Sequence, residues 1–135
     1  MVDIINEVYT RLKKLLPKAT VSLGRYEGKP SFPCVEINYI DDTNDIYNRD
    51  SGGDKYSIQT IEVNIYTTGK NKRPTSNDIR NTVNNLLAKE YNMNRGYGAE
   101  TLNYADMNVF RYTLRYSYRI DENKTIYRSW FLTWQ

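Results

Sequence analysis

The chain has 135 residues and a mass of 15.9 kDa, which predicts a single domain over residues 1–135 and argues against a two-domain enzyme. It holds no histidine and one cysteine, which excludes Ser-His-Asp triads, zinc fingers and an internal disulfide. Charge is uneven, with 8 basic against 10 acidic side chains in residues 1–68 and 11 against 6 in residues 69–135. The opposite net charges of the two halves suggest either a nucleic-acid face or two complementary faces on one subunit.

Residues 2–16 predict an amphipathic helix, because large apolar side chains recur along one face with a period of about 3.6 residues. Asp3 is placed to cap the start of this helix, and Pro17 ends it. The apolar stripe consists of Ile4, Ile5, Val8, Leu12, Leu15 and Leu16.

Three strands are expected next, at residues 19–23, 34–40 and 56–67, because apolar and polar side chains alternate along each segment. The second and third are expected to form one long hairpin. Neither a histidine nor a basic residue lies beside Cys34 in the sequence to activate its thiol, so we expect this cysteine to serve in packing rather than as a nucleophile.

The connection at residues 41–54 predicts a long, exposed polar loop, a type of segment that is often functional. Its aspartates do not follow the EF-hand pattern, since the position that requires glycine holds Ile46 when counted from Asp41. We therefore expect no metal here. The acidic side chains of the loop are Asp41, Asp42, Asp45, Asp50 and Asp54.

A second amphipathic helix is predicted over residues 76–91, where apolar side chains again recur with helical spacing. Thr75 and Asp78 resemble a capping box at its start. The asparagine- and glycine-rich stretch that follows predicts a loop. Within it, Arg95-Gly96-Tyr97-Gly98 matches the opening of an RNA-binding signature, but the stacking aromatics that should follow are missing, so a glycine turn is favoured.

Residues 109–120 alternate strictly and predict a strand with tyrosines, Phe110, Leu114 and Ile120 on one face. The opposite face carries Arg111, Arg115 and Arg119, which predicts a charged solvent or interface face. Residues 124–135 carry apolar side chains on both faces and predict a last strand or an extended arm. Both of its faces are expected to be buried against other parts of the protein or against another subunit. A central position in the sheet or a subunit contact would cover it.

The predicted elements follow the order helix, strands, helix, strands. A doubly wound fold would instead alternate single strands and helices along the chain. The sequence therefore predicts an α+β fold, with two amphipathic helices packed on one face of an antiparallel sheet. We find no candidate catalytic residue, no cofactor-binding motif and no metal ligand set, and we expect that the protein is not an enzyme. No window approaches the roughly 18 apolar residues that span a bilayer, so no membrane partner is expected.

This layout resembles the tail terminator family of tailed bacteriophages and phage-like tails, also called tail-completion proteins of the head-tail neck. The resemblance covers nearly the whole chain. It lies in the opening helix from Ile4-Ile5-Asn6-Glu7-Val8-Tyr9 to Leu16, the strand pair around a long polar loop, the segment Glu62-Val63-Asn64-Ile65-Tyr66, helix 76–91, and Phe110-Arg111-Tyr112-Thr113-Leu114-Arg115-Tyr116 running into an aromatic end.

The resemblance implies a structural virion protein, assembled in the host cytoplasm and located at the neck end of the tail. Such proteins form rings, usually hexameric, that bind the last ring of tail-tube subunits and stop tube growth. They then present a surface to neck, connector or sheath proteins, and DNA only passes through the lumen. Two alternatives stay open: a small nucleic-acid-binding module that uses the basic half, and another neck or connector protein of the same particle.

A heterologous ring needs two different complementary patches on each subunit. We expect the acidic loop at residues 41–54 to meet a basic stripe across the subunit boundary. The stripe consists of Arg111, Arg115, Arg119 and Arg128. The apolar side chains of Trp130, Phe131, Leu132 and Trp134 are expected to contact another subunit or the tube, or else to form a core strand.

Overall fold

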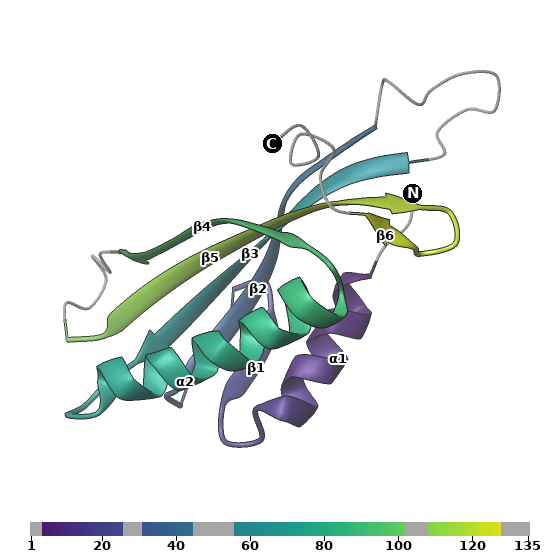
Figure 1. Cartoon of the computed structure of the whole chain (residues 1–135). Coiled ribbons are helices and arrows are strands. Elements are labelled where there is room, and N and C mark those ends of the chain that lie inside the picture. Colours follow the sequence, from purple (N-terminus) through teal and green to yellow (C-terminus); the bar gives the residue numbers. More distant parts are fainter. Residues whose placement is uncertain (1–3, 26–30, 45–55, 102–107, 128–135) are drawn as a thin grey trace, which may run out of the picture.

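The computed structural model describes residues 4–25, 31–44, 56–101 and 108–127. Helices and strands follow one another in the predicted α+β order (Figure 1). The elements are α1 (Ile5–Leu15), β1 (Thr20–Leu23), β2 (Cys34–Asn44), β3 (Tyr56–Thr67), α2 (Lys72–Asn84), the π-helical segment η2 (Asn85–Glu90), β4 (Asn94–Thr101), β5 (Phe110–Asp121) and β6 (Ile126–Tyr127).

The strands form one sheet in the order β1-β2-β3-β5-β4, and β6 also pairs with β5. All pairings are antiparallel except that of β1 with β2, which is parallel. The expectation of a purely antiparallel sheet is therefore wrong at this one edge. The parallel pairing arises because the chain crosses from the end of β1 back to the start of β2, so that Thr20 pairs with Cys34.

Both helices cover the same face of the sheet, as predicted (Figure 1). The apolar stripe of α1 and the inner positions of α2 and η2 meet alternate side chains of the central strands in one core. The prediction is wrong for one member of the stripe, because Leu15 in the last turn of α1 is 48% exposed. Burial of these side chains supplies the main driving force for folding. The largest fully buried side chains are Tyr116, Tyr118, Ile4, Leu12, Ile37, Ile61, Ile65, Leu86, Leu87, Met93, Leu114 and Ile120.

The second helix begins earlier than predicted and changes its winding before it ends. It starts at Lys72, so Thr75 lies inside the first turn and donates its backbone N–H to the Asn71 carbonyl; the capping-box prediction is wrong. Pro74 is tolerated because first-turn N–H groups have no partner within the helix. From Asn85 the helix widens, and Tyr91 N–H bonds the Leu86 carbonyl at 2.9 Å. Both Leu86 and Leu87 are fully buried in this segment.

Two strand predictions also need correction. β2 continues to Asn44, so Asp41 and Asp42 belong to a strand rather than to the predicted loop. The asparagine- and glycine-rich stretch contains β4, which was predicted as a turn and forms an edge of the sheet. Gly98 of β4 pairs in register with Leu114 of β5, and a Cβ at this position would lie 3.1 Å from Leu114 Cδ2, so the Leu114 side chain fills the space that a larger residue would need.

Within the described residues, no helix is long and apolar enough to cross a membrane.

Candidate functional site

The helix-free face of the sheet carries a hydrogen-bonded group of polar side chains, which we call the polar network. Ile61, Val63 and Ile65 of β3 point into the core, so the intervening side chains point to the opposite face. The strand register places these outward side chains of β3 next to the outward side chains of β2 and β5. The network consists of Glu36, Glu62, Asn64, Tyr66, Arg111, Thr113 and Arg115.

Asn64 lies at the centre of the polar network and is 2% exposed. Its Oδ1 accepts hydrogen bonds from Arg111 Nε and Nη2 at 3.2 and 3.0 Å, and from Thr113 Oγ1 at 2.7 Å. Its Nδ2 donates to Glu62 Oε1 at 2.9 Å. One amide therefore links two strands and holds two charged groups of opposite sign in place, which satisfies its own buried polar atoms.

Glu62 is a buried carboxylate, 8% exposed, paired with an arginine of the next strand. Arg115 Nε donates to Glu62 Oε2 at 2.8 Å. Burial acts to raise the pKa of the Glu62 carboxyl, but the hydrogen bonds from Asn64 and Arg115, with the charges of Arg115 and Arg111, outweigh it and lower the pKa. Glu62 is thus held ionised by its neighbours.

This lowered pKa makes the Glu62 contribution to stability pH-dependent. A carboxyl whose folded pKa lies below its unfolded value stabilises the fold above the unfolded pKa, and that stabilisation is lost as the pH falls through the folded pKa. Glu62→Gln is therefore expected to lower the free energy of unfolding by about 1–2 kcal/mol at neutral pH. The difference from the wild type should shrink below about pH 4. Urea unfolding at a series of pH values measures this.

A surface pair provides the matched control. Glu100 pairs with Arg73 at 3.1 Å, but both side chains are more than half exposed. Glu100→Gln should cost less than about 1 kcal/mol, because water screens such pairs. A Glu62→Gln variant whose stability follows the wild type at every pH would contradict the proposed role of the carboxylate.

At the β2 side of the polar network, Tyr66 donates its hydroxyl to Glu36 Oε1 at 3.0 Å, and the Arg111 guanidinium lies 5.7 Å from the Tyr66 ring centre. Burial, with the charge of Glu36, raises the pKa of Tyr66 to about 12. The same two causes raise the pKa of the Cys34 thiol to about 11. The buried thiol stays protonated at neutral pH, which agrees with the prediction that Cys34 is not a nucleophile.

The predicted arginine stripe is only partly free for a partner. Arg111 and Arg115 lie on the helix-free face with Thr113 between them, and each is bonded to β3 of its own chain. Arg115 keeps a side chain that is 49% exposed, and its guanidinium lies 5.4 Å from the ring centre of Tyr97 on β4. Arg119 is half-buried on the same face, beyond Ser117. Arg115 of the stripe thus pairs with Glu62, which the sequence analysis did not single out as a site residue.

The other predicted interface residues are only partly described. Asp41 and Asp42 lie on β2. The remaining ones lie outside the described residues: Asp45, Asp50, Asp54, Arg128, Trp130, Phe131, Leu132 and Trp134. Of the expected last strand at 124–135, the described part is β6, Ile126–Tyr127.

A second charged surface lies on the helix layer, where sequence reasoning had placed no site. Residues 4–18 and 69–91 together hold nine Lys and Arg against three Asp and Glu, a net charge of +6. Arg11 and Arg73 have acidic partners within the chain, Glu90 and Glu100. The lysines do not form ion pairs within the described part of the chain, and we call them the lysine surface: Lys13, Lys14, Lys18, Lys70, Lys72 and Lys89.

Among the described residues, no cluster of three or more Cys, Asp or Glu side chains is arranged to hold a metal ion. No protein-family model matches the chain, and no curated protein has significant sequence similarity to it.

Proposed function

We propose that this chain is a structural protein of a tailed phage or phage-like particle, which forms a ring on the end of the tail tube, stops tube growth and joins the tail to the neck. The order of its elements supports the proposal: an opening helix, a long hairpin, a second helix and a closing strand pair follow the layout on which the resemblance rests.

The observation that carries the proposal is that the end of β2 and the start of β3 extend past the helix layer (Figure 1). A heterologous ring contact joins two different surfaces of neighbouring subunits, and strands that extend beyond the core of their own subunit offer one such surface. Beside the start of this projection, Tyr39 and Ile40 are 37% and 47% exposed. Such side chains are suited to burial against another protein.

The test combines the purified protein with polymerising tail-tube protein of the same phage. Light scattering measures the mass of the protein alone and with short tubes, and electron microscopy measures tube length. We expect a ring, or a monomer that becomes a ring on tubes, together with shortened tubes of uniform length.

Other outcomes would overturn the proposal. A ring that leaves tube length unchanged would indicate another neck or connector protein. A persistent monomer that ignores tubes and binds oligonucleotides, with affinity falling steeply as salt rises, would indicate the nucleic-acid-binding module.

A further inference from the structure

We infer that an acidic segment of a partner protein binds beside α2, along a line of three arginines that we call the arginine row: Arg73, Arg80 and Arg95. Arg73 and Arg80 belong to α2, and Arg95 belongs to β4. The inference goes beyond the ring function and does not depend on it, because it concerns a surface that the single chain already presents.

Two of the three arginines are held in place by aromatic rings of β5. The Arg73 guanidinium lies 4.6 Å from the ring centre of Phe110, and the Arg80 guanidinium lies 4.0 Å from the ring centre of Tyr112. Both distances are within the range of a cation–π interaction. A guanidinium that is already positioned in this way loses less conformational freedom when it binds an anion.

The helix layer leaves the adjoining side of β4 uncovered. α2 packs on β3 and β5, whereas β4 lies beyond β5 at the edge of the sheet (Figure 1). Arg95, Gly98 and Glu100 of β4 pair in register with inward residues of β5, yet all three are exposed. Arg95 pairs with Tyr116, which is six residues from Phe110, about 20 Å along β5 at about 3.3 Å per residue. The arginine row is therefore long enough to contact several residues of a bound segment.

The arginine row carries positive charge that its own chain neutralises only weakly. Arg80 Nη2 donates to Asn77 Oδ1 at 3.0 Å, but neither Arg80 nor Arg95 forms an ion pair with another described residue. Arg73 donates to both carboxylate oxygens of Glu100, at 3.1 and 3.4 Å, but the two side chains are 64% and 52% exposed. An exposed pair of this kind contributes little stability, so a carboxylate of a partner can replace Glu100. Guanidinium groups bind carboxylates through two parallel hydrogen bonds.

The same contacts favour the carboxylates of a protein over a single-stranded nucleic acid. Proteins bind such strands by combining positive charge with aromatic rings that stack on the bases. Phe110 is buried and Tyr112 is half-buried, and each ring already has a guanidinium beside it. These rings are therefore not free to stack on bases, whereas the arginines remain accessible to an anion.

Fluorescence anisotropy with a labelled synthetic peptide of repeating Glu-Ser tests the inference. The wild type should bind this peptide, with affinity that falls as salt concentration rises, and should not bind a Gln-Ser peptide of the same length. Arg80→Gln with Arg95→Gln should weaken binding of the Glu-Ser peptide about tenfold or more, because two charge-assisted contacts are lost.

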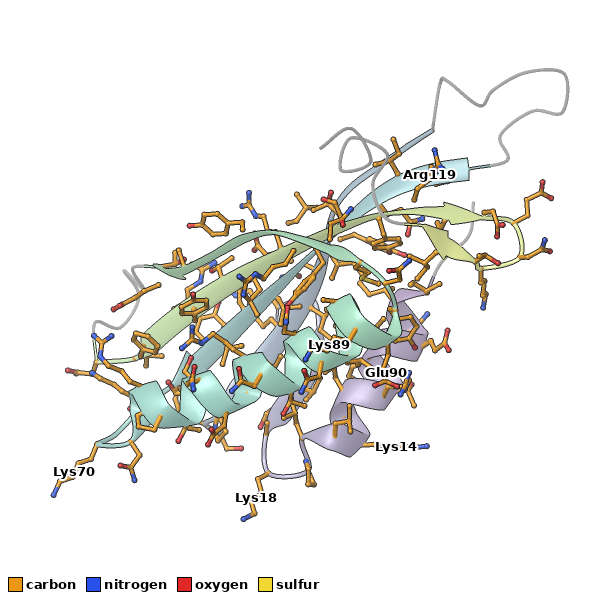
Figure 2. All side chains as sticks on the ribbon, viewed as in Figure 1. Lys14, Lys18, Lys70, Lys89, Glu90 and Arg119 are labelled. Atoms are coloured by element: carbon orange, nitrogen blue, oxygen red, sulfur yellow. The ribbon has the colours of Figure 1, made fainter. Side chains whose placement is uncertain are left out.

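Lys14→Gln with Lys18→Gln is the matched control, because it removes the same amount of charge at another place. Both lysines are exposed, and they project from α1 and the turn that follows it, away from β4 (Figure 2). This variant should change the affinity by less than about twofold, since screening limits the reach of distant charges. Circular dichroism of both double variants checks that the fold is retained.

Three outcomes would overturn the inference. The Glu-Ser peptide does not bind the wild type, or both double variants weaken its binding equally, which would mean that net charge alone attracts it. In the third, an oligonucleotide binds more tightly than the peptide and loses its affinity in the Arg80 and Arg95 variant, which would assign the arginine row to nucleic acid. None of these results affects the ring function, which is tested separately by tube length.

Discussion

Tyr116→Ala is expected to lower the free energy of unfolding by about 3–5 kcal/mol, the usual cost of deleting a buried aromatic side chain. Tyr116 of β5 is fully buried in the core, and its hydroxyl donates to Asn84 Oδ1 at 3.1 Å, which ties the sheet to the end of α2. Burial raises the pKa of this tyrosine to about 12, despite the opposing charge of Arg95, as expected for a ring removed from water. Equilibrium urea unfolding measures the loss.

Two variants separate the contributions of this side chain. Tyr116→Phe keeps the ring and removes the hydroxyl, so it should cost about 1 kcal/mol. Tyr97→Ala deletes a tyrosine that is 45% exposed on β4, and it should cost much less than Tyr116→Ala. Equal losses for the two alanine variants would show that Tyr116 does not hold the helix layer to the sheet.

Asn64→Leu is expected to lower the free energy of unfolding by about 2–4 kcal/mol, because it removes the centre of the polar network without changing side-chain volume much. The Thr113 hydroxyl and the Arg111 guanidinium would lose their acceptor, and the buried Glu62 carboxylate would lose a donor. A buried polar group that loses its hydrogen-bond partner destabilises the fold by more free energy than the hydrogen bond itself contributes on balance. Urea unfolding at neutral pH measures the effect.

Asn38→Leu provides the control for this change. Asn38 pairs in register with Glu62 and is half-buried on β2. Its replacement should cost much less than that of Asn64, about 1 kcal/mol or less, because the bonds of the polar network run through Asn64 and not through Asn38. An Asn64→Leu variant as stable as Asn38→Leu would contradict the central place of Asn64 in the network.

The pattern of apolar and polar residues along the chain was sufficient to predict those helices and strands in which the pattern repeats regularly over many residues. The stripe from Ile4 to Leu12 predicted α1, and the alternation of Phe110 to Ile120 predicted both β5 and the face that it buries. These predictions are confirmed because each such side chain must leave water on one side of its element, whatever the rest of the fold does.

Where the local sequence favours one secondary structure and tertiary contacts favour another, the sequence pattern predicted the wrong element. Arg95-Gly96-Tyr97-Gly98 has the composition of a turn, yet it lies in β4, because pairing with β5 satisfies its backbone along one side. Thr75 and Asp78 have the spacing of a capping box, yet α2 begins at Lys72. Burial of both Leu86 and Leu87 accompanies a π-helical segment that a 3.6-residue period cannot predict.

The sequence by itself determined the α+β class, the two amphipathic helices and the buried face of β5, because these depend on neighbours along the chain. Tertiary structure alone decided which charges are paired and which are free. Only the register of β3 against β5 places Glu62 beside Arg115 and Asn64 beside Thr113. Only the fold brings Lys18 and Lys70, which are far apart in the sequence, to the side of the molecule that lies away from the described ends of β2 and β3 (Figure 2). The energy of a charge depends on what lies within a few ångströms of it in space, and sequence separation does not fix that distance.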